Sequence, residues 1–164
     1  MTQLESLRQE FEFETAAARK MLTIVPADKF GWKPHAKSMT VKQLATHLAE
    51  LPGWVPMTFN TDELDFEKNP YTQPEIKSNE ELMSYFEQNV ASGRKQYNEG
   101  SEDVLDKPWT LRSGQTVYSV SPKRDILRMA MSQIIHHRAQ LGVYLRLLDV
   151  PIPGAYGPSA DESF

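Results

Sequence analysis

Apolar residues recur every three or four positions through four long stretches of the chain, and this spacing constrains the fold more than any other feature. A repeat of this kind places the apolar side chains on one face of a helix. The first stretch runs from about Thr2 to Val25, and Pro26 ends it. Glu14 interrupts its apolar stripe, so the inner face is expected to be either wet or functional there. The stripe contains Leu4, Leu7, Phe11, Ala18, Met21 and Val25.

A second helix is predicted to begin near Ser38 or Thr40, either of which is a suitable N-cap residue. Its apolar stripe continues to Leu51. Pro52 and Gly53 then end or kink it, although the apolar residues up to position 59 indicate a buried continuation.

The residues from Asn60 to about Lys77 are polar and acidic, and two prolines interrupt them. Such a segment is too long for a tight turn between neighbouring helices, so it is interpreted as a crossover connection. A third helix is expected to open at Ser78, with Glu81 completing a capping box, and to end before Gly100.

A stretch richer in β-forming residues precedes the last helix. Trp109–Arg112 and Gln115–Val120 flank a Ser-Gly pair, which is a hairpin signal. The fourth helix is predicted to start with Pro122 at its first position and to continue to about Leu148. The tail beyond it is rich in Pro and Gly and is expected to lie extended on the surface.

Together these elements favour an all-α fold: a single domain over residues 1–164, built as a four-helix bundle. A long crossover is expected between the second and third helices, and a small hairpin-like segment before the fourth. A chain of 164 residues is long enough to bury a core without disulfides.

Composition excludes several classes of function. With 18 Lys+Arg and 22 Asp+Glu the formal net charge is −4, which argues against a nucleic-acid partner. No apolar run approaches the roughly 18 residues of a membrane span, so no membrane partner is expected. The chain has no Cys, which excludes disulfides, thiolate metal sites and Cys nucleophiles. The absence of Cys fits a reducing compartment, and a cytoplasmic location is expected.

Two histidines lie on the predicted inner faces of different helices. His47 falls in the apolar stripe of the second helix. Gln133 and His137 are four residues apart in the stripe of the fourth, whereas His136 is rotated by about 100° from it. Buried imidazoles need partners. Either a metal ion or hydrogen bonds to neighbouring polar groups would supply partners for His47 and His137.

Several stretches of the chain match a known family: Lys37–Glu50, His136–Arg146, Pro151–Pro153 and Tyr156–Glu162. Through them, and over almost its full length, the chain resembles the DinB/YfiT-like superfamily of bacterial metalloproteins. The resemblance implies a four-helix bundle with a long crossover, a homodimer, and Zn²⁺ or Ni²⁺ bound between the second and fourth helices. The family's three metal ligands map onto His47, Gln133 and His137, so Gln stands where the family usually has His.

The resemblance also implies an activity, a metal-dependent hydrolase or thiol S-transferase acting on a small-molecule substrate or thiol. Two residues could replace the missing ligand: Glu50, one turn after His47, or His136 if it turned inward. Glu50 is also a candidate base. Arg138 is expected either to hold a substrate anion or to form an exposed ion pair. No GxSxG, P-loop, GxGxxG or HExxH motif occurs.

Two alternatives follow from Gln133. An amide can hydrogen-bond a neutral imidazole without any cation, because it carries both donors and an acceptor. The chain would then be a non-catalytic small-molecule-binding or stress-associated dimer that has lost the metal. In a further alternative, the inward histidines only fix the register of the helices.

Overall fold

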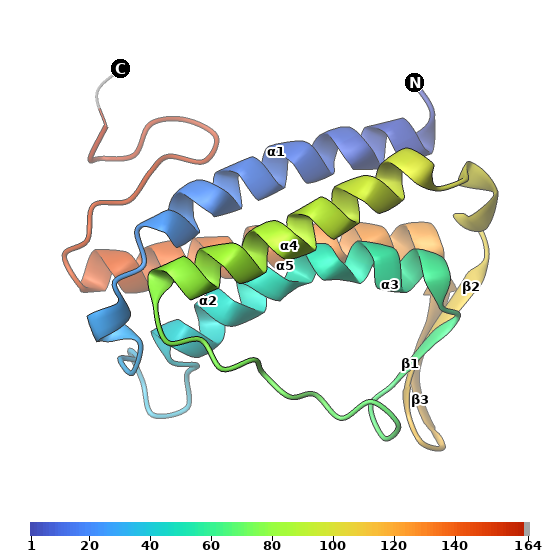
Figure 1. Ribbon diagram of the computed structural model, residues 1–164, viewed down its shortest axis with the longest axis horizontal. Coiled ribbons are helices and arrows are strands. Elements are labelled where there is room, and N and C mark those ends of the chain that lie inside the picture. Colours follow the sequence, from blue (N-terminus) through green and yellow to red (C-terminus); the bar gives the residue numbers. More distant parts are fainter. Residues whose placement is uncertain (163–164) are drawn as a thin grey trace.

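The computed structural model describes residues 1–162 and is mostly helical, as the apolar spacing predicts (Figure 1). The helices are α1 (Gln3–Thr23), α2 (Val41–Glu50), α3 (Trp54–Asn60), α4 (Asn79–Glu99) and α5 (Lys123–Leu147). Three short 3₁₀ turns connect them: η1 (Ala27–Lys29), η2 (Leu51–Gly53) and η3 (Glu102–Val104). The strands are β1 (Glu63–Asp65), β2 (Pro108–Ser113) and β3 (Thr116–Pro122). None of the helices among these residues is long and apolar enough to cross a membrane.

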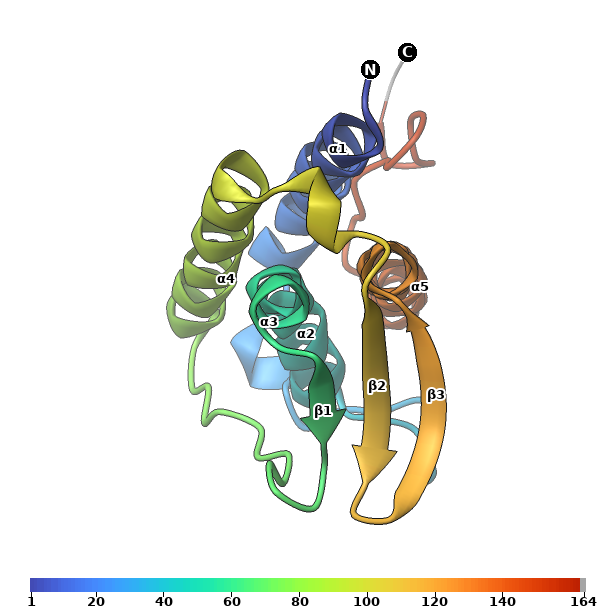
Figure 2. The same ribbon diagram turned by 90° about the vertical axis from the view of Figure 1, so that its right-hand side faces the viewer.

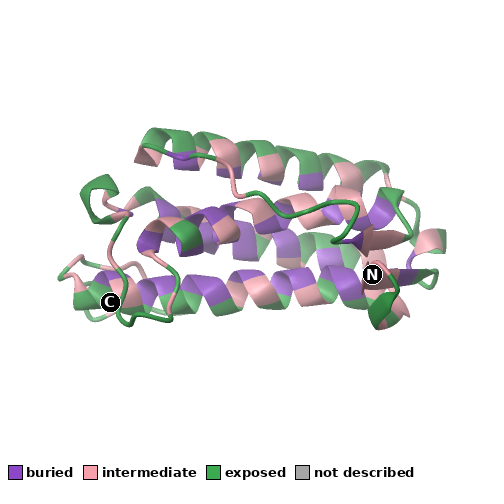
Figure 3. Ribbon diagram, turned by 90° about the horizontal axis from the view of Figure 1, so that it is seen from below, coloured by how far each residue is buried: buried purple, intermediate pink, exposed green. Residues whose placement is uncertain are grey.

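The long helices pack side by side with their buried faces turned inward. Helices α1 and α2 each contact both α4 and α5. Helix α3 continues the direction of α2 beyond η2 and also packs on α4 and α5 (Figure 1). The buried stripes of the helices face one another, whereas the segment that joins α3 to α4, residues 61–78 and here named the crossover, is largely exposed (Figure 3). The core includes Phe11, Leu48, Phe86, Leu127 and Ile134.

Polar caps set where α2 and α4 begin. Thr40 is the N-cap of α2: its Oγ1 accepts from the Gln43 N–H at 3.2 Å, and the Gln43 side chain accepts from the Thr40 N–H at 2.9 Å. Ser78 caps α4 as predicted, since its hydroxyl accepts from the Glu81 N–H. The second half of that predicted capping box is wrong, because the Glu81 carboxylate accepts from the Lys77 N–H instead.

As predicted, Pro52 and Gly53 end α2, and the chain continues beyond them as a buried segment. Pro52 falls in the 3₁₀ turn η2, where α2 has ended, and the chain then resumes as α3. Val55, Thr58 and Phe59 are buried, so the continuation belongs to the core. At the start of α5 the prediction is off by one residue. Pro122 keeps an extended backbone at the end of β3 and serves as the N-cap.

The three strands form a sheet at one end of the molecule, in the order β1-β2-β3 (Figure 2). Strands β2 and β3 are the predicted antiparallel hairpin, and its turn contains Gly114 at φ +54°, which suits glycine. Strand β1, which was not predicted, runs parallel to β2. Asp65 ties it to the hairpin, because its Oδ1 accepts from the Gly114 N–H at 2.9 Å.

The C-terminal tail is held on α1 and α5 by a buried ionic cluster that sequence analysis did not foresee. Arg138 is 3% exposed and contacts Glu14 Oε2 at 2.5 Å, so the expectations of an exposed ion pair for Arg138 and of a wet inner face at Glu14 are wrong. The Tyr156 hydroxyl donates to Glu14 Oε1 at 2.9 Å and accepts from Arg138 at 2.6 Å. Asp161 binds Arg146 and the Ile152 N–H, which further orders the tail.

Candidate metal site and adjoining cleft

The packing of α2 against α5 brings His47 and His137 together. Their ring centroids lie 4.6 Å apart with the planes nearly perpendicular, at 74°. His137 is buried, and the His47 side chain is 24% exposed. Both residues follow from the apolar stripes of their helices, which turn these positions toward the same space between the helices.

Each imidazole is held at Nδ1 by an oxygen atom one turn further along its own helix. His47 Nδ1 lies 2.6 Å from Glu50 Oε1, and His137 Nδ1 lies 3.0 Å from Gln140 Oε1. An oxygen acceptor at Nδ1 favours the tautomer with its proton there and leaves Nε2 with a free lone pair. Such an arrangement is typical of histidines that bind a metal through Nε2.

Burial also favours the neutral form of the His137 imidazole. It lowers the pKa of this imidazole, and the neighbouring His47 and His136 lower it further, against the hydrogen bond to Gln140 Oε1, which raises it. The neutral form is therefore favoured. Neutral imidazole is the form that donates a lone pair to a cation.

The third family position, Gln133, lies one turn before His137 on α5 and is half-buried. A spacing of four residues keeps it on the same side of the helix. Within residues 1–162, no group of three or more His, Cys, Asp or Glu side chains is arranged to hold a metal ion. The Gln133 amide oxygen stays the candidate third protein ligand that the family resemblance implies.

The two candidate replacement ligands, Glu50 and His136, are placed differently. Glu50 uses Oε1 for His47 and Oε2 for the Tyr71 hydroxyl at 2.9 Å, so both oxygens are engaged in positioning other groups. His136 lies on the exposed side of α5, although its ring centroid is 4.9 Å from that of His137.

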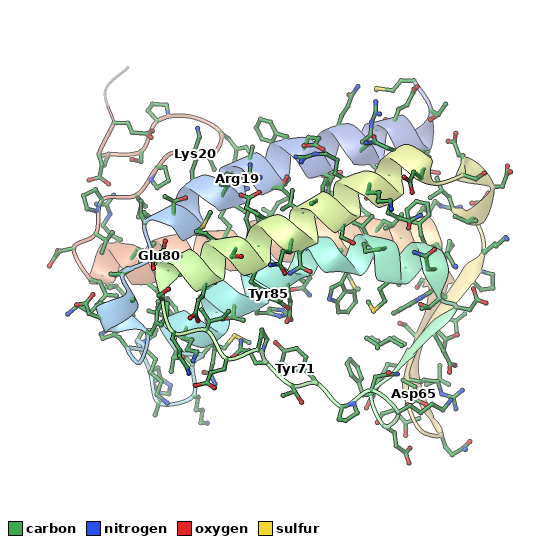
Figure 4. The ribbon with its side chains drawn as sticks, in the orientation of Figure 1. Arg19, Lys20, Asp65, Tyr71, Glu80 and Tyr85 are labelled. Carbon is green, nitrogen blue, oxygen red and sulfur yellow. The ribbon has the colours of Figure 1, made fainter. Side chains whose placement is uncertain are left out.

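Tyr71 is the site residue that sequence reasoning missed. It comes from the crossover and reaches the carboxylate of Glu50, on the side of the molecule along which α2 runs (Figure 4). Burial raises the pKa of Tyr71, and the Glu50 carboxylate raises it further, so the phenol stays a hydrogen-bond donor. No local pattern marks Tyr71, because the contact depends on how the crossover folds back over α2.

A cleft of about 920 Å³ opens beside His47, between the α2–α3 segment and the crossover. This volume is within the usual range of small-molecule sites, about 300–1,000 Å³. His47 and Glu50 line the middle of it, and Asn89 reaches it from α4. The other lining residues are Lys37, Ser38, Met39, Gln43, Gly53, Trp54, Met57, Leu64, Phe66, Asn69, Tyr71 and Gln73.

A small sheet at one end, a histidine pair between two packed helices and a long crossover over a cleft define the class: a mostly helical protein with a candidate small-molecule site. The sequence identifies the family within this class. The DinB family model matches residues 1–163, and the chain belongs to the DinB family. The resemblance inferred from the histidine-bearing stretches is thus confirmed.

Three relatives illustrate the range of similarity within the family. The uncharacterised protein YrdA of Bacillus subtilis is 24% identical over 163 residues, which cover 97% of this chain and 91% of YrdA. The crystal structure of the DinB-like protein YjoA of Bacillus subtilis is similar with a TM-score of 0.69 at 20% identity, over 92% of this chain and 97% of YjoA. A DinB-family structure from Exiguobacterium sibiricum gives 0.70 at 19% identity, over 94% and 97% of the two chains.

A mycothiol-dependent maleylpyruvate isomerase shares the same fold. Its TM-score is 0.61 at 20% identity, and the similarity covers 85% of this chain and 60% of the isomerase chain. At this level of identity the similarity establishes a common fold. It also places one thiol-dependent enzyme among the structural neighbours.

Proposed function

We propose that this DinB-family chain is a four-helix bundle, with a long crossover between α3 and α4, that binds Zn²⁺ or Ni²⁺ between α2 and α5. The ligands are His47, His137 and the Gln133 amide oxygen, with water completing the sphere. The observation that carries the proposal is the His47–His137 pair, in which each Nδ1 atom lies within hydrogen-bonding distance of an oxygen and the ring centroids are 4.6 Å apart. In the tautomer protonated at Nδ1, each Nε2 atom has a lone pair for a metal ion. Imidazole nitrogen is a preferred ligand of both metals.

We further propose that the site serves a thiol transfer or a hydrolysis. A divalent metal bound there would lower the pKa of a thiol or water molecule next to it. The chain has no Cys, so any thiol must come from a second substrate. The thiol-dependent isomerase among the structural neighbours supports the thiol form of the proposal.

The chain's own residues orient the site. Glu50 holds the proton at His47 Nδ1, and Tyr71 donates to the other oxygen of the same carboxylate. The carboxylate is thereby fixed by two partners, and it makes the imidazole a better electron donor at Nε2. Gln140 has the corresponding role for His137, although an amide oxygen polarises the ring less than a carboxylate does.

Elemental analysis of untagged protein tests metal binding. We expect Zn or Ni at up to one equivalent in the parent, and its loss in His47→Ala and His137→Ala. His136→Ala is the matched control, since it removes an exposed imidazole next to His137 on α5. Equal metal content in all three variants would show that the metal lies elsewhere. An assay with low-molecular-weight thiols and an electrophilic chloroarene then tests the transfer reaction.

The second candidate function is a non-catalytic small-molecule-binding protein that has lost the metal. Gln133 favours it, because replacing a ligand imidazole by an amide weakens a site with only two other protein ligands. A parent protein without metal, even after incubation with Zn²⁺ and Ni²⁺, would support this candidate and overturn the first.

A further inference from the structure

We propose that the cleft between α2, α3 and the crossover binds an elongated organic acid with an apolar body, such as a medium-chain carboxylic acid. The apolar body lies against Trp54, Met57, Leu64 and Phe66, and the acid group lies at Lys37. This binding does not depend on the metal, so it goes beyond the function proposed above.

The lining of the cleft changes character along its length. Lys37 precedes the start of α2, while Trp54 and Met57 lie on α3, beyond its end. Ten helical residues at a rise of 1.5 Å separate the two ends by about 15 Å. The end at α3 is apolar, with Leu64 and Phe66 facing it from the crossover side. The end at Lys37 carries the polar groups of Ser38, Gln43 and Gln73.

Charge sets the orientation of an acid in this cleft. The sequence from residue 29 to residue 49 contains four lysines, Lys29, Lys33, Lys37 and Lys42, and no Asp or Glu. No ion pair among the described residues involves Lys37.

The opposite end of the cleft offers an acid no comparable partner. Leu64 and Phe66 alternate there with carboxylates at positions 63, 65 and 67, and Lys68 and Arg112 pair with Glu63 and Asp65. Among the described residues that line the cleft, Lys37 is the only Lys or Arg, so an anion is attracted to that end.

The Glu50 carboxylate in the middle of the cleft does not attract the acid group of the ligand. Glu50 lies there, and its two oxygens are engaged by His47 and Tyr71. A carboxylate placed beside it would meet like charge. An apolar chain can pass this point, because burying its methylene groups against the apolar side chains of the cleft is favourable.

Isothermal titration calorimetry with dodecanoate and with dodecanol, on protein kept in excess chelator, tests the proposal. We expect dodecanoate to bind more tightly than dodecanol. In Lys37→Gln the affinity for dodecanoate falls about threefold, as expected for one exposed charge pair, while that for dodecanol is unchanged. Lys20→Gln, which removes an exposed lysine of α1 away from the cleft, is the matched control (Figure 4).

Met57→Glu tests the apolar end, since it places a carboxylate among the apolar lining residues. We expect both ligands to bind at least tenfold more weakly, with an unchanged thermal melt showing that the variant folds.

The proposal is overturned if dodecanoate gives no binding, or if Lys37→Gln and Met57→Glu leave its affinity unchanged. It is also overturned if dodecanoate binds only with metal present and only when His137 is intact, because the acid would then be a metal ligand. Binding in chelator together with an absence of metal in the parent would retain this proposal and reject the metal site.

Discussion

Gln133 is the residue on which the strength of the proposed metal site most depends. Replacing it by histidine restores three imidazoles, with two of them four residues apart on α5. We expect Gln133→His to raise the affinity for Zn²⁺ at least tenfold, or about 1.4 kcal/mol, as measured by competition with a chromophoric chelator. Ser132→His is the control, because Ser132 is exposed on the same helix. Equal affinities of Gln133→His and the parent would place residue 133 outside the coordination sphere.

The buried ion pair of Glu14 and Arg138 gives a second prediction at this scale. Removing one partner leaves a buried, uncompensated charge, which costs about 3–5 kcal/mol. We expect Glu14→Ala to lower the free energy of unfolding in urea by this amount. Glu12→Ala breaks the exposed pair with Arg94 on the same helix and should cost about 1 kcal/mol or less. Similar losses in the two variants would contradict the burial of the Glu14 pair.

The contacts of Glu14 and of Tyr71 could not be predicted from the sequence. The polar position Glu14 is visible as an interruption of an apolar stripe, but its partner Arg138 lies 124 residues away. Tyr71 and Glu50 meet because of the path of an irregular segment. Local periodicity fixes the face of a helix on which a residue lies, and it carries no information about which distant side chain shares that space.

At the level of elements, Gly93 lets α4 approach α1 and the η2 turn. A Cβ atom at this position would lie 2.7 Å from Phe11 Cζ and 2.9 Å from the Pro52 carbonyl oxygen. Such crowding costs about 1–3 kcal/mol, and the better helix propensity of alanine returns only about 1 kcal/mol. We therefore expect Gly93→Ala to lower the melting temperature. Gly31→Ala, which would meet no atom within 4 Å, should leave it unchanged or slightly raised.

The sheet gives a prediction on pH. The Gly114 N–H lowers the pKa of Asp65 below its ordinary value of 3.8, with a smaller contribution in the same direction from the Glu67 N–H and an opposing one from burial. Asp65 therefore binds a proton more readily in the unfolded chain than in the folded one. The stabilisation is complete above the ordinary pKa and is lost as the pH falls through the lower folded value.

We expect Asp65→Asn to melt at a lower temperature than the parent at pH 7, and the difference to narrow below about pH 4. Thermal melts followed by circular dichroism between pH 7 and pH 3 measure this. A difference that stays constant over that range would show that the charge of Asp65 does not stabilise the sheet.

The elements differ in how well sequence alone predicts them. Helices α1, α4 and α5 follow directly from apolar spacing and caps, because both are local. The β2–β3 hairpin is local as well. Strand β1 has only three residues, and its pairing with β2 joins positions 47 residues apart, such as Glu63 and Thr110. A strand this short is defined by its partner and not by its own sequence.

At the scale of the whole molecule, the homodimer implied by the family resemblance stays a prediction. Val143 and Leu147 are both 59% exposed and lie one turn apart on α5. We expect sedimentation equilibrium to give twice the 18.7 kDa chain mass for the parent and a single chain mass for the Val143→Glu/Leu147→Glu double variant. Val120→Glu on β3, another exposed apolar position, is the control. A monomeric parent would reject the dimer.

The crossover forms one wall of the cleft, yet it takes little part in the packing of the helices. It is tied down at β1 and by the contacts of Tyr71 with Glu50 and of Gln73 with the Gln43 carbonyl group. Exposed connecting segments tolerate insertions and deletions far better than packed helices do. Gain or loss of a few residues here would therefore reshape the ligand space while His47 and His137 kept their positions. One scaffold can in this way diverge to many ligands through changes confined to a single loop.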